Sequence, residues 1–300
     1  MAFVSQLRKA PVESTQQTFD HPTGPVEYLV AGEGQPLLCI HGTGVSNQTV
    51  LNLESRLLDE GFQLIIPHRP GYYGTSLGQR TTPQSAAELY AALLDSLGHE
   101  RVSVVGTSGG GPSSICFAQQ FAERVDRMVL QCPVTHQWDD RAWMPAPDRW
   151  SFPLIKRTWL RKSVRPLYRY LANKNGGNRD RWLPRLAGDR YEEIRDDPET
   201  LELANVLMAA SLDALRSPSG MQNDLDVFCR SAWTEPEKIT CPLLLLHDPG
   251  DTFVPFKHSE WLHAEVPQSE LQTLHCAGHL LWSGDEVERF GDLRRDFLRS

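Results

Sequence analysis

The sequence contains no long apolar segment. No apolar run approaches the roughly 18 residues that a membrane-spanning helix requires, and the first twenty residues lack the apolar core of a secretory signal. We therefore expect a cytoplasmic protein that does not associate with membranes. The chain of 300 residues is long enough for one large domain, or for a core that carries an inserted module.

Recognisable cysteine motifs are also missing. The six cysteines are widely scattered, mostly within apolar stretches, and no two have C-x-x-C spacing. In a chain of this length the pattern is typical of buried free thiols in a reducing compartment. It argues against a disulfide framework and predicts no metal site. The cysteines are Cys39, Cys116, Cys132, Cys229, Cys241 and Cys276.

An excess of positive charge is absent as well. The formal net charge is −8, which disfavours general binding to nucleic acids or anionic membranes. Residues 156–190 are an exception, with eleven Lys or Arg and two acidic residues, and six acidic residues follow between 192 and 202. We interpret this basic segment as a solvated helix face that the following acids neutralise. An anion or nucleic-acid site with a steep salt dependence is the alternative.

Short apolar runs alternate with helical patterns along the chain. Strands buried on both faces and separated by helices predict an α/β fold with a mainly parallel twisted sheet of about eight strands, covered by helices on both faces. The capping pattern Ser85-Ala-Ala-Glu88 is expected to begin one helix. The expected strands cover residues 28–31, 36–40, 63–66, 102–105, 127–131, 242–247 and 270–274; the expected helices cover residues 46–60, 85–97, 109–123, 256–264 and 284–299.

One long region interrupts this alternation. Residues 134–235 contain no convincing strand pattern, but they hold six of the eight tryptophans. We predict a helical lid inserted over one end of the sheet. The core would then consist of residues 1–133 and 236–300.

The segment Gly106-Thr-Ser-Gly-Gly-Gly-Pro112 places a serine between glycines where a buried strand ends and a helix begins. It fits the G-x-S-x-G pattern, in which a strained turn exposes the serine hydroxyl. The pattern alone is weak, and the strand and helix on its two sides strengthen it. An ordinary glycine-rich turn is the alternative. Ser108 is the predicted nucleophile.

A serine nucleophile needs a base and an acid that orients the base. In parallel sheets these groups gather at the carboxyl ends of strands. Asp248 and Asp251 follow the expected strand 242–247, and His275 and His279 follow the next one. The order Ser, Asp, His matches the one that this serine turn requires.

Four motifs together make the chain resemble the α/β-hydrolase family, in its serine-nucleophile branch with a helical lid. They are HGTG at 41–44, GTSGGGP at 106–112, GDTFVP at 250–255 and AGHLLW at 277–282. The resemblance implies that Asp251 in D-x-x-V-P is the acid and that His279, after a glycine, is the base. It also implies an oxyanion hole formed by the backbone N–H groups of Thr43 and Gly109. Asp248 is the weaker candidate for the acid, and His275 is interpreted as structural.

One loop departs from the family pattern. Relatives often read D-R-P-G-Y-G-x-S, whereas residues 68–76 read HRPGYYGTS, with histidine in place of aspartate and an additional tyrosine. The hydrogen bonds of this loop therefore cannot be carried over from the family. His41 is interpreted mainly as a loop-stabilising residue, although it is retained among the candidate substrate contacts. These candidates are His41, Gly42, Tyr72, Tyr73, Trp138, Trp143 and Val254.

The resemblance implies acyl transfer without a metal or organic cofactor. We expect a hydrolase that cleaves carboxylic esters or lactones of a small to medium, largely apolar substrate through an acyl-enzyme. We expect a small-molecule substrate, no nucleic-acid or membrane partner, and a monomer or homodimer. The alternatives are a C–C bond hydrolase or an aminopeptidase that uses the same triad, and a ligand-binding protein that retains the fold.

Overall fold

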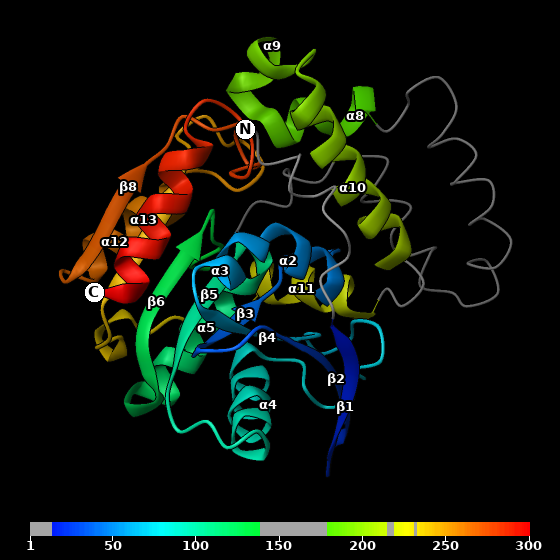
Figure 1. Cartoon of the computed structure of the whole chain (residues 1–300), viewed down its shortest axis with the longest axis vertical. Coiled ribbons are helices and arrows are strands. Elements are labelled where there is room, and N and C mark those ends of the chain that lie inside the picture. Colours follow the sequence, from blue (N-terminus) through cyan, green and yellow to red (C-terminus); the bar gives the residue numbers. More distant parts are fainter. Residues whose placement is uncertain (1–13, 139–178, 215–218, 231–232) are drawn as a thin grey trace, which may run out of the picture.

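The computed structural model describes residues 14–138, 179–214, 219–230 and 233–300. Its centre is one eight-stranded sheet in the order β1-β2-β4-β3-β5-β6-β7-β8 (Figure 1). The pairs β1–β2 and β2–β4 are antiparallel, and β4, β3, β5, β6, β7 and β8 run parallel. The strands are β1 (Thr15–His21), β2 (Gly24–Ala31), β3 (Gln35–Ile40), β4 (Phe62–Pro67), β5 (Val102–Thr107), β6 (Val125–Gln131), β7 (Leu243–His247) and β8 (Ser269–Thr273).

Helices cover both faces of the sheet. Successive strand residues point to opposite faces, so that Leu37 and Cys39 of β3 join one apolar cluster while Leu38 and Ile40 join the other. The predicted α/β class, with a mainly parallel sheet and helices on both faces, is confirmed. The first cluster includes α2 (Asn47–Leu53), α3 (Ser55–Asp59) and α13 (Val287–Arg299); the second includes α4 (Pro83–Ser96), α5 (Gly111–Gln120) and α12 (Lys257–Glu265).

The described parts of the region 134–235 contain helices and no strand, as the sequence pattern predicts. Figure 1 shows α8, α9 and α10 beyond one end of the sheet. The exact limits of the insertion remain a prediction. Its elements are α8 (Arg179–Ala187), η5 (Gly188–Arg190), α9 (Tyr191–Ile194), α10 (Pro198–Ala214) and α11 (Ser219–Arg230).

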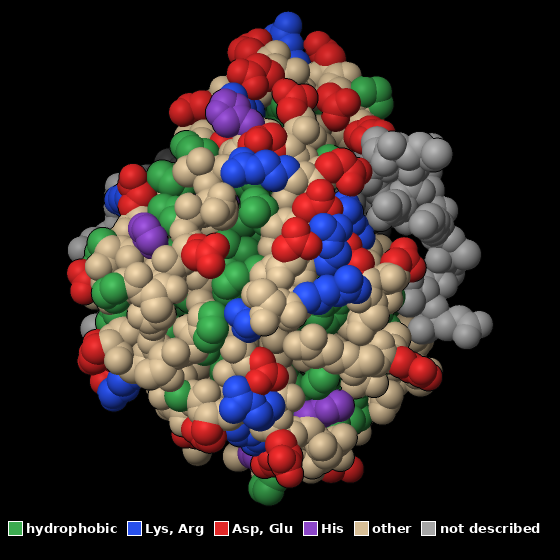
Figure 2. Space-filling view, turned by 60° about the vertical axis from the view of Figure 1, so that its left-hand side comes forward, with side chains coloured by type: hydrophobic (Ala, Val, Ile, Leu, Met, Phe, Trp, Pro, Cys, Tyr) green, Lys and Arg blue, Asp and Glu red, His purple; other side chains and the backbone are tan. Residues whose placement is uncertain are grey.

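Most of the basic segment 156–190 lies outside the described residues, so its interpretation stays a prediction. On the face that Figure 2 presents, the described acidic and basic side chains are interspersed. None of the helices in the described ranges has the length and apolar content needed to cross a bilayer.

Two local predictions need correction, and one strand was missed. The helix α4 begins at Pro83, not at the predicted cap Ser85, because the Thr82 hydroxyl accepts from Ser85 N and the Ser85 side chain bonds back to Thr82 N. The helix expected at 46–60 is divided into α2 and α3 at Glu54. The edge strand β1 was not predicted, because its residues are mostly exposed and carry little apolar patterning.

The histidine that departs from the family pattern has a defined place. His68 is buried; its Nδ1 lies 2.8 Å from Glu27 Oε2, and its Nε2 accepts from Asn47 N at 3.0 Å. Burial lowers the pKa of His68 to about 4 and outweighs the opposing effect of Glu27. A neutral His68 therefore donates to Glu27 and accepts from the start of α2, which ties this loop to the sheet.

Restoring the usual aspartate should therefore destabilise the protein. His68→Asp would bring a second carboxylate close to Glu27 in a mostly buried site, and we expect a loss of about 1–3 kcal/mol in the free energy of unfolding. Urea unfolding measures it. His68→Asn is the matched control, because it cannot repel Glu27 and should lose less. Equal losses in the two variants would show that repulsion from Glu27 is unimportant.

Candidate active site

Ser108 sits on a strained corner between β5 and α5. Its φ is 51°, in the left-handed region that residues other than glycine rarely adopt. The corner is tight, because a Cβ on Gly106 would overlap the Ser114 side chain of the following helix. The predicted strand, turn and helix thus surround Ser108 and direct its side chain to the carboxyl ends of the parallel strands.

Three side chains far apart in the sequence meet at this edge. Ser108 Oγ lies 3.0 Å from His279 Nε2, and His279 Nδ1 lies 2.6 Å from Asp251 Oδ2. Both distances are within the range of about 2.6–3.2 Å expected for a nucleophile, its base and the orienting acid. All three residues are buried, with Ser108 and His279 each 8% exposed.

The Asp251 carboxylate is held by its own loop. Its Oδ1 accepts from the backbone N–H groups of Phe253 and Val254 at 2.8 and 3.0 Å, and its Oδ2 also lies 3.2 Å from His247 Nε2. Burial would raise the pKa of Asp251, but the interactions with His279 and His247 outweigh burial and lower it to about 2. Asp251 is therefore ionised at neutral pH.

The loop that carries His279 rests on the insertion. The N–H of His279 donates to Leu186 O of α8 at 2.7 Å, and a Cβ on Gly278, whose φ is 64°, would overlap the carbonyl of Ala187. Burial lowers the pKa of His279, but the Asp251 carboxylate raises it well above its usual value. The imidazolium that forms when a base takes a proton is thus stabilised.

The competing residues occupy other positions. Asp248 Oδ1 accepts from Gly250 N at 2.7 Å and its Oδ2 accepts from Gly278 N at 3.2 Å. This carboxylate therefore connects the loop that carries Asp251 to the loop that carries His279. His275 is exposed and contacts Arg190 of η5.

The backbone N–H groups of Thr43 and Gly109 lie next to Ser108. A Cβ on Gly42 would lie 3.3 Å from Ser108 Cβ, and a Cβ on Gly109 would lie 3.1 Å from Thr43 N. Within the described part of the chain neither N–H has a protein acceptor. The two loops therefore present two free donors beside the serine, which is the arrangement an oxyanion hole requires.

Comparison with known proteins decides the family. A model of the alpha/beta hydrolase family matches residues 37–292 of this chain. The chain belongs to the alpha/beta hydrolase family. The fold and the order of the four motifs agree with this assignment.

Individual members of the alpha/beta hydrolase family align over almost the whole chain. An uncharacterized hydrolase of Bacillus subtilis (strain 168), YcgS, is 29% identical over 94% of this chain and 97% of the relative. A 2-hydroxy-6-oxo-6-phenylhexa-2,4-dienoate hydrolase of Comamonas testosteroni is 26% identical over 91% of each chain. The solved alpha/beta hydrolase fold protein from Nakamurella multipartita has a TM-score of 0.76 and 28% identity, covering 95% of this chain and 99% of its own.

Two of the candidate substrate contacts in this hydrolase form hydrogen bonds with neighbouring protein groups. His41 is buried, with Nδ1 2.7 Å from Gly42 O and Nε2 accepting from Arg69 N at 2.9 Å. Tyr72 is also buried, and its hydroxyl donates to Asp224 Oδ2 at 2.6 Å. These bonds use both nitrogens of His41 and the hydroxyl of Tyr72, so the two rings stabilise the loops.

The other candidate contacts have different surroundings. Tyr73, with φ of 46°, stacks on His68 at 4.4 Å between ring centroids. Trp138 and Val254 are buried in one apolar cluster of the core. Trp143 lies outside the described residues. Gly42 lies beside Ser108, and the role of this set in substrate binding stays a prediction.

Sequence reasoning missed three side chains at the alpha/beta hydrolase site. His247 bonds to Asp251, and its position four residues before Asp251 at a strand end could have indicated this. Cys132, with φ of 40° at the end of β6, has its Sγ 4.0 Å from His279 Nε2. Asp224 of α11 bonds to the Thr43 hydroxyl at 2.6 Å; a single acid on a helix of the insertion gave no sequence signal.

Proposed function

We propose that this protein is a serine hydrolase that cleaves carboxylic esters or lactones of small to medium, largely apolar substrates through an acyl-enzyme. One observation carries the proposal: a continuous hydrogen-bonded series runs from Ser108 Oγ through the His279 ring to Asp251. Such a series is the arrangement that makes a serine hydroxyl reactive.

The geometry supports a two-step reaction. His279 Nε2 takes the proton of Ser108 as Oγ attacks the carbonyl carbon, and Asp251 stabilises the imidazolium. The N–H groups of Thr43 and Gly109 bind the oxygen that becomes negative. His279 then gives its proton to the leaving alcohol, and a water molecule activated by the same base releases the acid.

Aromatic side chains beside the triad support an apolar substrate. The ring of Phe253 lies 4.9 Å from the ring of His279, and the ring of Trp182 lies 6.5 Å from that of Phe253. On the other side, Phe228 of α11 approaches Gly109, since a Cβ on this glycine would lie 3.1 Å from Phe228 Cζ. Such apolar linings are typical of small-molecule sites.

Hydrolysis of a C–C bond is the second candidate. It is favoured by the likeness to the 2-hydroxy-6-oxo-6-phenylhexa-2,4-dienoate hydrolase of Comamonas testosteroni, which extends over 91% of both chains. The same nucleophile, base and oxyanion donors would serve that reaction, so substrate specificity alone separates the two candidates.

A fluorophosphonate probe and a substrate panel test the proposal together. We expect the probe to label one residue, Ser108, by peptide mass mapping, and p-nitrophenyl butyrate and a simple lactone to be hydrolysed. A 2-hydroxy-6-oxo-dienoate and an aminoacyl amide should react more slowly than the ester. Faster cleavage of the dienoate would select the C–C hydrolase, and labelling without any turnover would indicate a ligand-binding member of the fold.

A further inference from the structure

Asp224 joins the insertion to the predicted oxyanion hole. It lies on α11 and is 5% exposed. Its Oδ2 accepts from the hydroxyls of Thr43 and Tyr72, both at 2.6 Å, and from Arg69 Nη2 at 2.6 Å. Its Oδ1 accepts from Arg69 Nη1 at 2.9 Å. One carboxylate thus accepts four hydrogen bonds from three side chains of two core loops.

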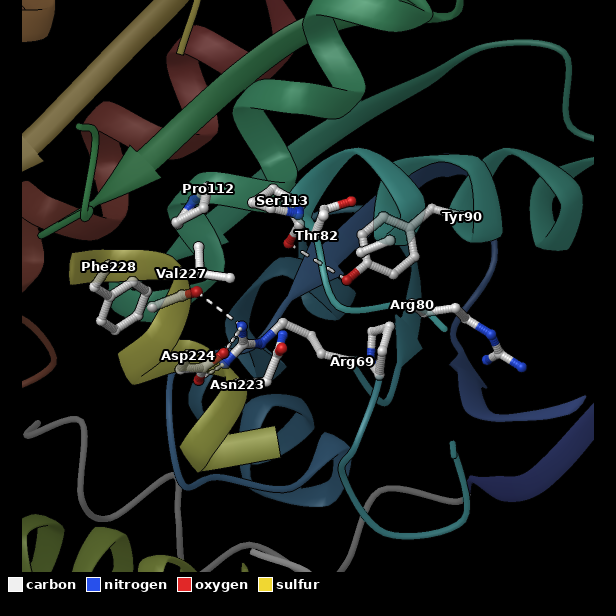
Figure 3. Close-up of a pocket in the computed structure, with 14 residues that line it drawn as sticks. Arg69, Arg80, Thr82, Tyr90, Pro112, Ser113, Asn223, Asp224, Val227 and Phe228 are labelled. Carbon is white, nitrogen blue, oxygen red and sulfur yellow. Dashed lines mark hydrogen bonds and ion pairs between the residues drawn. The ribbon is translucent and has the colours of Figure 1, made fainter. Parts of the chain in front are cut away.

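Arg69 extends the same connection to the second oxyanion residue. Its Nη1 also donates to Gly109 O at 2.9 Å. Figure 3 shows Arg69 beside Asp224. Both residues that supply the predicted oxyanion donors, Thr43 and Gly109, are therefore bonded to the Arg69–Asp224 pair. The pair therefore holds the Thr43 side chain and the Gly109 carbonyl, and in this way restrains the two residues that carry the N–H groups.

The negative charge of Asp224 also affects the predicted oxyanion hole. A buried carboxylate so close to Thr43 would disfavour negative charge on a substrate oxygen. The bidentate Arg69 guanidinium neutralises it, and burial of the two ions without each other would be costly. The charge of Asp224 raises the pKa of Arg69 against the effect of burial, so the guanidinium stays protonated.

We propose that Asp224 is a positioning residue that sets the oxyanion hole from the insertion, and that Arg69 is its counter-ion, which keeps the site favourable for a negative oxygen. This inference rests on the proposed acyl-transfer function. The core loops alone do not complete the site, because the carboxylate that fixes them comes from α11.

Variants at Asp224 test the positioning role. Asp224→Ala should lower kcat for a p-nitrophenyl ester by about 10–100-fold with little change in KM, since oxyanion contacts are made mainly in the transition state. The inhibition constant of a trifluoromethyl ketone, whose adduct has an oxyanion, should rise by a similar factor. Asp224→Asn keeps an acceptor for Thr43 and should lose less.

A matched acid on the same helix supplies the control. Asp226 is two positions further on and projects about 200° around α11 from Asp224, so Asp226→Asn should keep the wild-type kcat. Activity is measured per fluorophosphonate-labelled site, which removes any contribution from misfolded protein. Wild-type kcat and inhibitor affinity in Asp224→Ala would overturn the positioning role.

Chemical rescue tests the counter-ion role. A small pocket of about 30 Å³ lies beside the ion pair and is lined by Arg69, Asp224, Tyr90 and Gly109 among others (Figure 3). Arg69→Ala would enlarge this pocket and leave Asp224 uncompensated. We expect this variant to be slower than Arg69→Ala/Asp224→Ala, and methylguanidinium in the millimolar range to restore part of its rate.

The double variant and a salt control complete the test. Methylguanidinium should not accelerate Arg69→Ala/Asp224→Ala, and equal concentrations of methylammonium should rescue neither variant. An Arg69→Ala rate equal to that of the double variant, without rescue, would overturn the counter-ion role. If the wild-type protein is labelled but turns over no acyl substrate, the ester proposal fails. The variants at Asp224 and Arg69 are then compared by their rate of fluorophosphonate labelling instead of kcat. Absence of both labelling and turnover rejects the function and the inference together.

Discussion

Alanine in place of Ser108 should reduce ester hydrolysis by about 10⁵–10⁶-fold, because loss of a triad nucleophile leaves only binding and the oxyanion donors. The protein should fold, since the hydroxyl makes one hydrogen bond, to His279, in the described structure. Initial rates with p-nitrophenyl butyrate and labelling by a fluorophosphonate measure the loss. Both signals should disappear together.

Two further variants make this result specific. Ser113→Ala removes a hydroxyl from α5, where it bonds to Gly110 O rather than to His279, and should keep near wild-type activity. Ser108→Gly should be as inactive as Ser108→Ala but more stable by about 1 kcal/mol, since glycine adopts a φ of 51° without steric cost. Undiminished turnover in Ser108→Ala would reject Ser108 as the nucleophile.

The parallel part of the fold was predictable because its signals are local. Apolar runs that are buried on both faces mark β3, β5 and β7, and their alternation with helices fixes the class. The edge strand β1 lacks this signal, since among the described strands it pairs only with β2 and most of its side chains face solvent. The start of α4 was misplaced because Ser85 fits the cap pattern in the sequence, whereas in the structure Thr82 is the cap and Ser85 completes its capping box.

The candidate site also contains residues with a local sequence signal and residues without one. Motifs around Ser108, Asp251 and His279 are short, and the parallel sheet brings their strand ends to one edge. The contacts of Asp224 span 181 residues to Thr43 and 155 to Arg69. They depend on how α11 packs on the core, which no local pattern in the chain indicates. The predicted substrate contacts stay a prediction, because a residue beside a motif need not face the cavity.

The insertion contacts both halves of the candidate site. On one side α8 and η5 support the base and acid loops: Leu186 O accepts from His279 N, and Asp189 N donates to Gly250 O at 3.0 Å. On the other side α11 supplies Asp224 to the oxyanion loop. A change in the packing of the insertion would therefore alter proton transfer and charge stabilisation together.

Asp251→Asn should lower kcat by about 10⁴-fold, because an amide cannot hold the reactive tautomer of His279 or stabilise its imidazolium. The pH profile should shift as well. His279 acts as a base only when neutral, so wild-type activity should rise with pH as this proton leaves, with a midpoint above 6.5 because Asp251 raises the pKa of His279. Removing the charge of Asp251 should move the midpoint down.

Asp248→Asn is the matched comparison, since it replaces a second buried carboxylate in the same loop. Its amide can keep the bond from Gly250 N, but its NH₂ group would face the N–H of Gly278, so we expect a loss of about 1–3 kcal/mol in unfolding free energy. Activity should fall far less than in Asp251→Asn, and the pH midpoint should stay near that of the wild type. The two variants thus separate orientation of the base from support of its loop. The reverse pattern, with catalysis lost in Asp248→Asn and kept in Asp251→Asn, would transfer the role of the acid to Asp248.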